Sequence, residues 1–192
     1  MIKAWNQSFN MFTKSILAGV LIGLGVIINL QSSDRIIGAL LFSFGLLTII
    51  EMQLLLYTGK IGFLEEDLMP KLIPILIFNC IGIAITIFLY GAANPDFNTV
   101  ITNAANIKFA KGYLTLFING CFCGALIHFA VKNKVKILTI FAIMIFILID
   151  AEHCIADFPY LLYAPSFENI CKFIEIICGN SMGALMIERL TW

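Results

Sequence analysis

Charged side chains are scarce in this sequence. Lysine, arginine, aspartate and glutamate together make up 12% of the 192 residues, against about a quarter in ordinary soluble proteins. The 12 basic and 12 acidic residues balance, so there is no basic surplus to neutralise the phosphates of a nucleic acid. Apolar residues make up 60% of the chain, and the mean hydropathy is +0.97. Too few charges remain to cover a soluble surface, so the composition predicts an integral membrane protein.

The motifs of common enzymes are also missing. The sequence has no Walker phosphate-binding loop, no H-E-x-x-H zinc motif and no G-x-S-x-G nucleophile motif. All six cysteines lie in or beside apolar runs. The closest pair, Cys121 and Cys123, lacks both the spacing and the second ligand pair of a zinc site. We therefore expect no metal and no cofactor, and we interpret the cysteines as small packing residues.

Six apolar segments follow one another, near the length of about 20 residues that crosses a bilayer as a helix. The sequence predicts an all-α membrane protein with one domain over residues 1–192. Residues 1–14 are mildly amphipathic and indicate an interfacial helix. Residues 91–111 indicate a polar loop. The six spans are expected at about residues 16–30, 36–63, 72–89, 113–131, 137–163 and 170–187.

The basic residues predict the orientation of these spans. An even number of crossings puts both termini on one side of the membrane, and most of the basic residues fall on that side. By the positive-inside rule, both termini are expected to be cytoplasmic, in the cell (inner) membrane. The basic residues on that side are Lys3, Lys14, Lys60, Lys71, Lys132, Lys134, Lys136 and Arg189, and those opposite are Arg35, Lys108, Lys111 and Lys172.

Polar residues interrupt the second and fifth spans. Residues 57–62 bring two glycines and a threonine hydroxyl into the second span, and residues 150–157 bring four ionisable groups into the fifth. Each interruption falls in the middle span of a three-span half, which is typical of transporters built from inverted repeats with broken helices. The alternative is that each interruption is an ordinary loop between shorter helices.

His153 and Thr58 are the candidate functional residues within these interruptions. His153 stands among Asp150, Glu152 and Asp157, and an ionisable side chain at membrane depth indicates a functional site. Histidine can also exchange a proton near neutral pH. The Thr58 hydroxyl could contact a small anion. The alternatives are that His153 only ties a broken helix together and that Thr58 only caps a helix.

Taken together, these motifs resemble the formate/nitrite transporter family. The resemblance rests on Y-T-G at 57–59, E-H-x-I-A at 152–156 and G-N-x-x-G at 179–183, and it extends from about Ser15 to Ile187. It implies an aquaporin-like inverted repeat with broken second and fifth helices, assembled as a homopentamer in the lipid bilayer. Each protomer would conduct a small monovalent anion such as formate, nitrite or hydrosulfide.

The resemblance also implies roles for individual residues. Thr58 and His153 would face one another between two hydrophobic constrictions, and Glu152 would orient His153 or balance its charge. Lys108 would draw anions toward the pore, and Asn180 belongs to the motif of the sixth span. By residue type alone, Lys108 is an ordinary loop lysine, and the constriction residues are ordinary hydrophobes. The constriction positions are Phe42, Leu46, Leu56 and Phe146.

The sequence departs from the family pattern at four positions, one of which is Cys154 after His153, where the family pattern has serine. Where family members often carry asparagine, this chain has Lys60 after Thr58-Gly59, Gly124 after Cys123, and Asp157 after the E-H motif. With its short loops and termini, the chain resembles a divergent member. The departures concern the substrate more than the fold, so the choice of anion stays open.

A weak acid could cross the apolar constrictions more cheaply by accepting a proton, with His153 as the expected proton donor or electrostatic guide. Replacing His153 should then abolish or reshape the pH dependence of flux. Three alternatives stay open. An aquaporin-like channel for a neutral solute is disfavoured because the Asn94-Pro95 pair stands alone. A membrane enzyme would have to use the acids around His153, and a non-transporting scaffold would show no flux.

Overall fold

The computed structural model describes residues 2–63, 65–133 and 135–191, with side chains from residue 10 onward. Regular structure in these ranges is helical, with no strand. The helices are α1 (Ile2–Gln31), α2 (Arg35–Glu51), α3 (Tyr57–Lys60), α4 (Leu72–Ala93), α5 (Pro95–Phe109), α6 (Tyr113–Lys132), α7 (Lys136–Leu148), α8 (Cys154–Tyr163) and α9 (Phe167–Leu190), with short 3₁₀ turns η1 (Ile61–Phe63) and η2 (Met69–Lys71).

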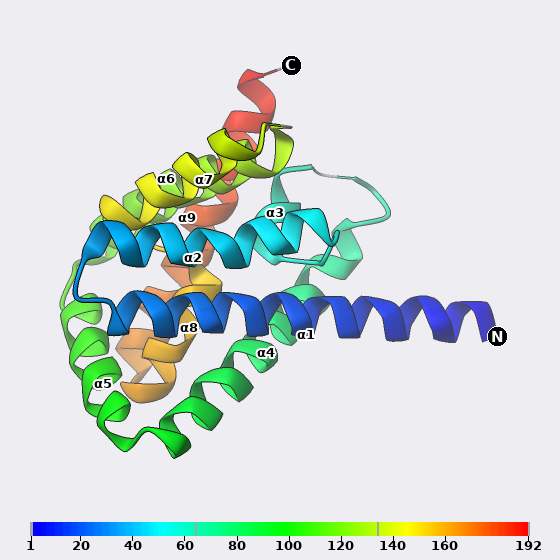
Figure 1. Ribbon diagram of the computed structural model, residues 1–192. Helices are drawn as coiled ribbons and strands as arrows, with labels where there is room; N and C mark the ends of the chain where they lie inside the picture. Colours follow the sequence, from blue (N-terminus) through cyan, green and yellow to red (C-terminus); the bar gives the residue numbers. More distant parts are fainter. Residues whose placement is uncertain (1, 64, 134, 192) are drawn as a thin grey trace.

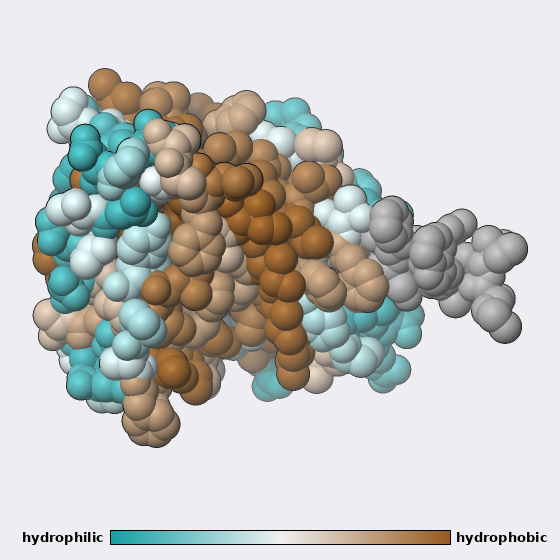
Figure 2. Space-filling view, turned by 90° about the horizontal axis from the view of Figure 1, so that it is seen from below, coloured by the Kyte–Doolittle hydropathy of each residue, from teal (hydrophilic) through white to brown (hydrophobic). Residues whose placement is uncertain are grey.

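Four helices are long and apolar enough to cross a membrane. They cover Asn10–Gln31, Met69–Ala93, Tyr113–Lys132 and Phe167–Leu190. Many of their apolar side chains remain exposed on the outside of the molecule. Figure 2 shows these side chains as a hydrophobic band between hydrophilic ends. A band of this kind is what contact with lipid requires.

Two expected features differ in the structure. The predicted interfacial helix at 1–14 is not a separate element, because α1 runs unbroken into the first span and no glycine or proline interrupts it before Gly19. Met1 lies outside the described residues. The predicted polar loop at 91–111 contains α5, which begins at Pro95. The loop prediction missed its buried apolar stripe, which repeats every fourth residue at Phe97, Ile101, Ala105 and Phe109.

Two helix pairs form the frame, α1 against α4 and α6 against α9 (Figure 1). Glycines allow the closest approaches. A side chain at Gly82 of α4 would collide with the backbone carbonyl of Ile16 in α1, and one at Gly183 of α9 would collide with that of Cys121 in α6. α2 packs beside α1 in one half, and α7 packs beside α6 in the other. The two halves therefore use the same kind of contact between corresponding helices.

The backbone breaks lie between α2 and α3 and between α7 and α8. Gln53 and Asp150 both adopt positive φ angles, 52° and 54°, which non-glycine residues seldom do. Leu56 and His153, the residues before the next helices, are both extended. The first break therefore occupies residues 52–56 and not the predicted 57–62, where Tyr57 begins a helix. The second is shorter than predicted, because helix resumes at Cys154.

The glycines that suggested the first break provide space instead of flexibility. No described glycine has a positive φ angle. A side chain at Gly62 would collide with the ring of His128, and one at Gly59 would crowd Val131. The sequence analysis therefore placed this interruption later in the chain than the structure does.

A buried asparagine holds each break. Asn79 of α4 accepts a hydrogen bond from the Tyr57 N–H (2.9 Å) and donates to the carbonyls of Ser15 (2.7 Å) and Leu55 (2.8 Å). Asn180 of α9 accepts from the Cys154 N–H (2.8 Å). Its amide group donates to the carbonyls of Gly120 and Glu152, at 2.9 and 2.7 Å.

These two clamps correspond in detail. Each asparagine accepts from the first residue of the resumed helix and donates to the residue two positions earlier. Each also donates to the helix packed against its own, α1 or α6. Both side chains are fully buried, so at the breaks they replace water as the partner of backbone groups.

Replacing either asparagine with alanine should destabilise the protein by several kcal/mol, because each buried polar group left unpaired costs about 1–3 kcal/mol. The measurement is the midpoint of thermal unfolding in detergent for Asn79→Ala and Asn180→Ala. Cys178→Ala is the matched control, since this side chain is exposed on the same helix as Asn180. Asparagine variants that unfold at the temperature of Cys178→Ala would contradict the clamp.

Candidate functional site

Thr58 and His153 meet in the interior, between the two breaks. Thr58 lies in the single turn of α3, and His153 is the residue immediately before α8. The Thr58 Oγ1 and His153 Nε2 atoms are 2.9 Å apart, and both residues are buried. The structure therefore brings together the two residues that the sequence singled out, although 95 positions separate them.

The hydrogen bonds of His153 indicate where its proton lies. The backbone N–H of Ala156 donates to Nδ1 of His153 at 3.0 Å, so Nδ1 acts as an acceptor and caps the start of α8. In a neutral imidazole the proton then resides on Nε2, which donates to the Thr58 hydroxyl oxygen. The Thr58 hydroxyl keeps its own proton and can donate it to a further acceptor.

Aromatic rings cover one side of this pair. Phe42 of α2 and Phe146 of α7 pack edge to face, with ring centres 5.8 Å apart. The Phe146 ring also stacks near the His153 ring at 6.0 Å. These three rings line a pocket of about 330 Å³, which we call the Lys108 pocket because Lys108 and Lys111 line it as well.

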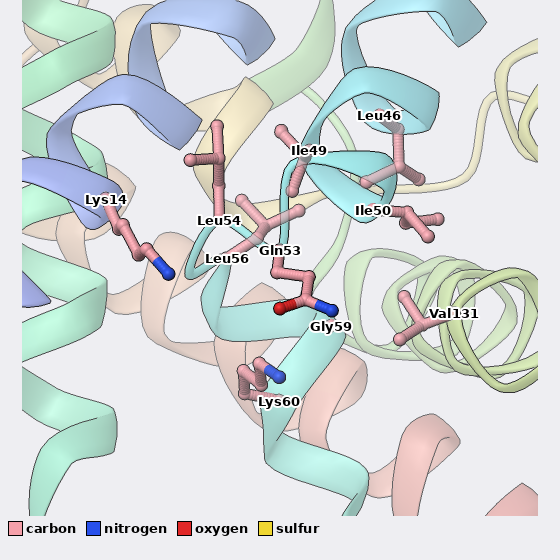
Figure 3. A pocket seen from close by; sticks show the side chains of 10 residues that line it. All are labelled: Lys14, Leu46, Ile49, Ile50, Gln53, Leu54, Leu56, Gly59, Lys60 and Val131. Atoms are coloured by element: carbon pink, nitrogen blue, oxygen red, sulfur yellow. The ribbon is translucent and has the colours of Figure 1, made fainter.

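A second pocket, of about 370 Å³, lies on the side of α3 and the first break. Leu46 and Leu56 line it, together with Gly59, the residue after Thr58. Lys14, Gln53 and Lys60 bring polar groups to this Lys60 pocket (Figure 3). The four predicted constriction residues thus divide between the pockets, the phenylalanines in one and the leucines in the other.

A cluster of charged side chains stands in the Lys108 pocket. Lys108 contacts the carboxylates of both Glu152 and Asp157, the latter at 2.9 Å. Lys111 contacts the other oxygen of Glu152 at 2.6 Å. The Lys108 ammonium also lies 5.1 Å from the centre of the Tyr160 ring, which favours a cation.

Lys108 remains a cation in this cluster. It belongs to α5, outside the predicted spans. Burial lowers the pKa of Lys108, but the Asp157 and Glu152 carboxylates outweigh burial and raise that pKa above its ordinary value. The residue predicted to draw anions is therefore charged and lines the same pocket as His153.

Glu152, expected to orient His153 or to balance its charge, does not hydrogen-bond the His153 ring. Its carboxylate binds the two lysines, whereas the ring nitrogens of His153 are occupied by Thr58 and Ala156. The Asn180 amide makes its hydrogen bonds to the backbone groups of the second clamp, so it acts on the site by holding the backbone. Among the described residues, no cluster of histidine, cysteine and acidic side chains could hold a metal ion.

Sequence reasoning missed Asn79 and Lys111. A signal for Asn79 existed, because N-x-x-G occurs at 79–82 and again at 180–183, in corresponding helices of the two halves. Lys111 carried no comparable signal. Its contact with Glu152 joins residues 41 positions apart and depends on the packing of α5 against α8.

The comparisons with known proteins agree with this geometry. The family profile described as "Formate/nitrite transporter" matches residues 1–190. A search of curated protein sequences finds no match. Among solved structures, an "FNT family ion channel" is similar, with a TM-score of 0.82 and 19% identity over 98% of this chain and 90% of that one.

A second similar structure is titled "Pentameric formate channel with formate bound". Its TM-score is 0.77, with 17% identity over 97% of each chain. At these identities the structures show a shared fold, whereas the family profile covers nearly the whole sequence. The chain therefore belongs to the formate/nitrite transporter family, whose members are membrane channels and not enzymes.

Proposed function

We propose that this protein is a channel for small monovalent anions of weak acids, with formate, nitrite and hydrosulfide as the candidate substrates. The observation that carries the proposal is the buried hydrogen bond between Thr58 and His153, with an aromatic pocket on one side and an aliphatic pocket on the other. Family membership and the formate-bound relative support the class of substrate.

The proposed topology has six spans in one domain over residues 1–192. Four are the long apolar helices. The other two are broken, α2 with α3 and α7 with α8, and the matching asparagine clamps support an aquaporin-like inverted repeat. The basic residues favour cytoplasmic termini in the cell (inner) membrane. By likeness to the pentameric relative, we propose a homopentamer with one pathway in each protomer.

The proposed pathway begins in the Lys108 pocket, where the lysines attract the anion. It then passes Phe42 and Phe146 to reach the Thr58 hydroxyl. This hydroxyl donates a hydrogen bond to the anion in place of the hydration water that the anion has lost. Leu46 and Leu56 form the second constriction before the Lys60 pocket. A bare anion loses much hydration between such side chains, so crossing as the neutral acid lowers the cost.

His153 acts in this proposal by orienting Thr58. The Nε2–H group of His153 donates a hydrogen bond to the Thr58 oxygen, so the threonine's own proton is available for a hydrogen bond to the substrate. A second proton on Nδ1 would point at the Ala156 N–H and would break the cap of α8. We therefore place His153 as a positioning residue, and the proton that accompanies the anion enters from the water of the Lys108 pocket.

Thr58→Val keeps the shape of the side chain and removes the donor. We expect formate flux into proteoliposomes to fall by roughly 10- to 100-fold, the effect of losing one hydrogen bond to a charged group. Thr139→Val is the matched control, because Thr139 is a buried threonine of α7 that bonds a backbone carbonyl. Equal flux through the two variants would contradict the role of Thr58.

His153→Asn separates positioning from proton donation, because asparagine can still cap α8 but cannot titrate near neutral pH. We expect a lower flux, since Thr58 is no longer oriented, with the same relative change between acidic and neutral pH as in the wild type. The measurement is the pH profile of formate uptake. A variant that keeps the acid flux but loses the pH dependence would show instead that His153 is the proton donor.

A further inference from the structure

Two buried carboxylates share a single lysine in the Lys108 pocket. Lys108 contacts both Glu152 and Asp157, and Lys111 adds a second cation on the far oxygen of Glu152. The Glu152 side chain is fully buried, and that of Asp157 is 4% exposed. Two ionised carboxylates this close together repel one another unless a proton or a cation lies between them.

One oxygen of this pair has no partner. Asp157 Oδ1 is bound by Lys108, but Oδ2 is buried and accepts no hydrogen bond from any described residue. The carboxylates of Glu152 and Asp157 lie close together, because both contact the same Lys108 ammonium. Two ionised carboxylates have no donor to offer each other, whereas a single proton between them makes a hydrogen bond. A shared proton would therefore satisfy the unpartnered oxygen.

We infer that Glu152 and Asp157 share one proton and form a proton-binding site that sets the charge of the Lys108 pocket. The inference rests on the proposed function, because the ligand that senses this charge is the transported anion. With the proton bound, the two lysines and the two acids sum to +1. Without it they sum to zero, and the pocket loses its attraction for an anion.

Proton and anion binding are consequently linked. An anion in the pocket favours the protonated cluster, and the proton favours the anion by the same factor. The pocket therefore takes up the proton and the anion together, before the anion enters the constriction. The titratable and charged groups near Asp157 are Lys108 of α5, Lys111, Cys123 of α6, Asp150, Glu152 and His153 before α8, and Cys154 and Tyr160 of α8.

None of these neighbours other than the acid pair changes charge near neutral pH. Lys108 remains a cation, and buried thiols and phenols stay neutral in this pH range. His153 is held as a neutral acceptor at the start of α8. A change in pocket charge with pH therefore points to Glu152 and Asp157.

Asp157→Asn is the decisive variant. Asparagine has the same shape as aspartate but carries no charge, so the two lysines and Glu152 would sum to +1 at every pH. Asp150→Asn is the matched control, because Asp150 lines the same pocket but is exposed and paired with Arg35. Asparagine also tolerates the positive φ angle at that position.

The measurement is the half-saturation concentration for formate uptake at outer pH values from about 5 to 8. Burial can move the pKa of a carboxyl group into this range. For the wild type and Asp150→Asn we expect it to rise roughly tenfold with pH, the effect of losing one nearby charge. For Asp157→Asn we expect it to stay constant. Because all three proteins face the same solutions, protonation of formate itself cancels in the comparison.

A wild-type rise that persists in Asp157→Asn would overturn the inference. So would an assembled Asp157→Asn protein that transports no formate at acidic pH. Infrared spectroscopy of the wild type gives an independent readout, in which a protonated carboxyl band at neutral pH is expected to disappear at alkaline pH. Absence of that band would overturn the inference even if Asp157→Asn failed to assemble. Absence of wild-type flux would instead refute the proposed function, and the band would still decide the inference.

Discussion

The structure depends on one interaction used twice, a buried asparagine amide that holds a broken backbone. Inside a membrane, a backbone group without a partner costs several kcal/mol, so a helix can stop at mid-depth only where other protein groups replace its bonds. Asn79 and Asn180 supply these bonds at the two breaks. Because both breaks are held open, Thr58 and His153 can meet between the halves.

Much of this arrangement was predictable from the sequence. The apolar runs predicted a membrane protein, and the polar residues within them drew attention to Thr58 and His153, which the structure brings together. The exact break in the second span was not predictable, because glycines mark flexible backbone by default, whereas Gly59 and Gly62 here make room for Val131 and His128. Helix α5 was predicted as a loop because polar residues dominate its composition.

The charged cluster could not be predicted from the sequence. Lys108 and Glu152 are 44 positions apart, and their contact arises only when α5 packs against α8. The resemblance to the family pointed to Lys108 as an attractor of anions. The structure adds that its charge is shared between two acids, one of which stands where family members often have an asparagine. The number of acids on Lys108 therefore decides how positive the pocket is.

The proposed pathway admits a small anion and excludes a small neutral solute such as glycerol. The most direct measurement compares the entry of formate and of glycerol into liposomes carrying the wild-type protein, with empty liposomes alongside. The account predicts rapid, saturable formate entry and glycerol entry no faster than in empty liposomes. Fast glycerol entry without formate entry would contradict it and would favour an aquaporin-like channel, and entry of neither would favour a scaffold.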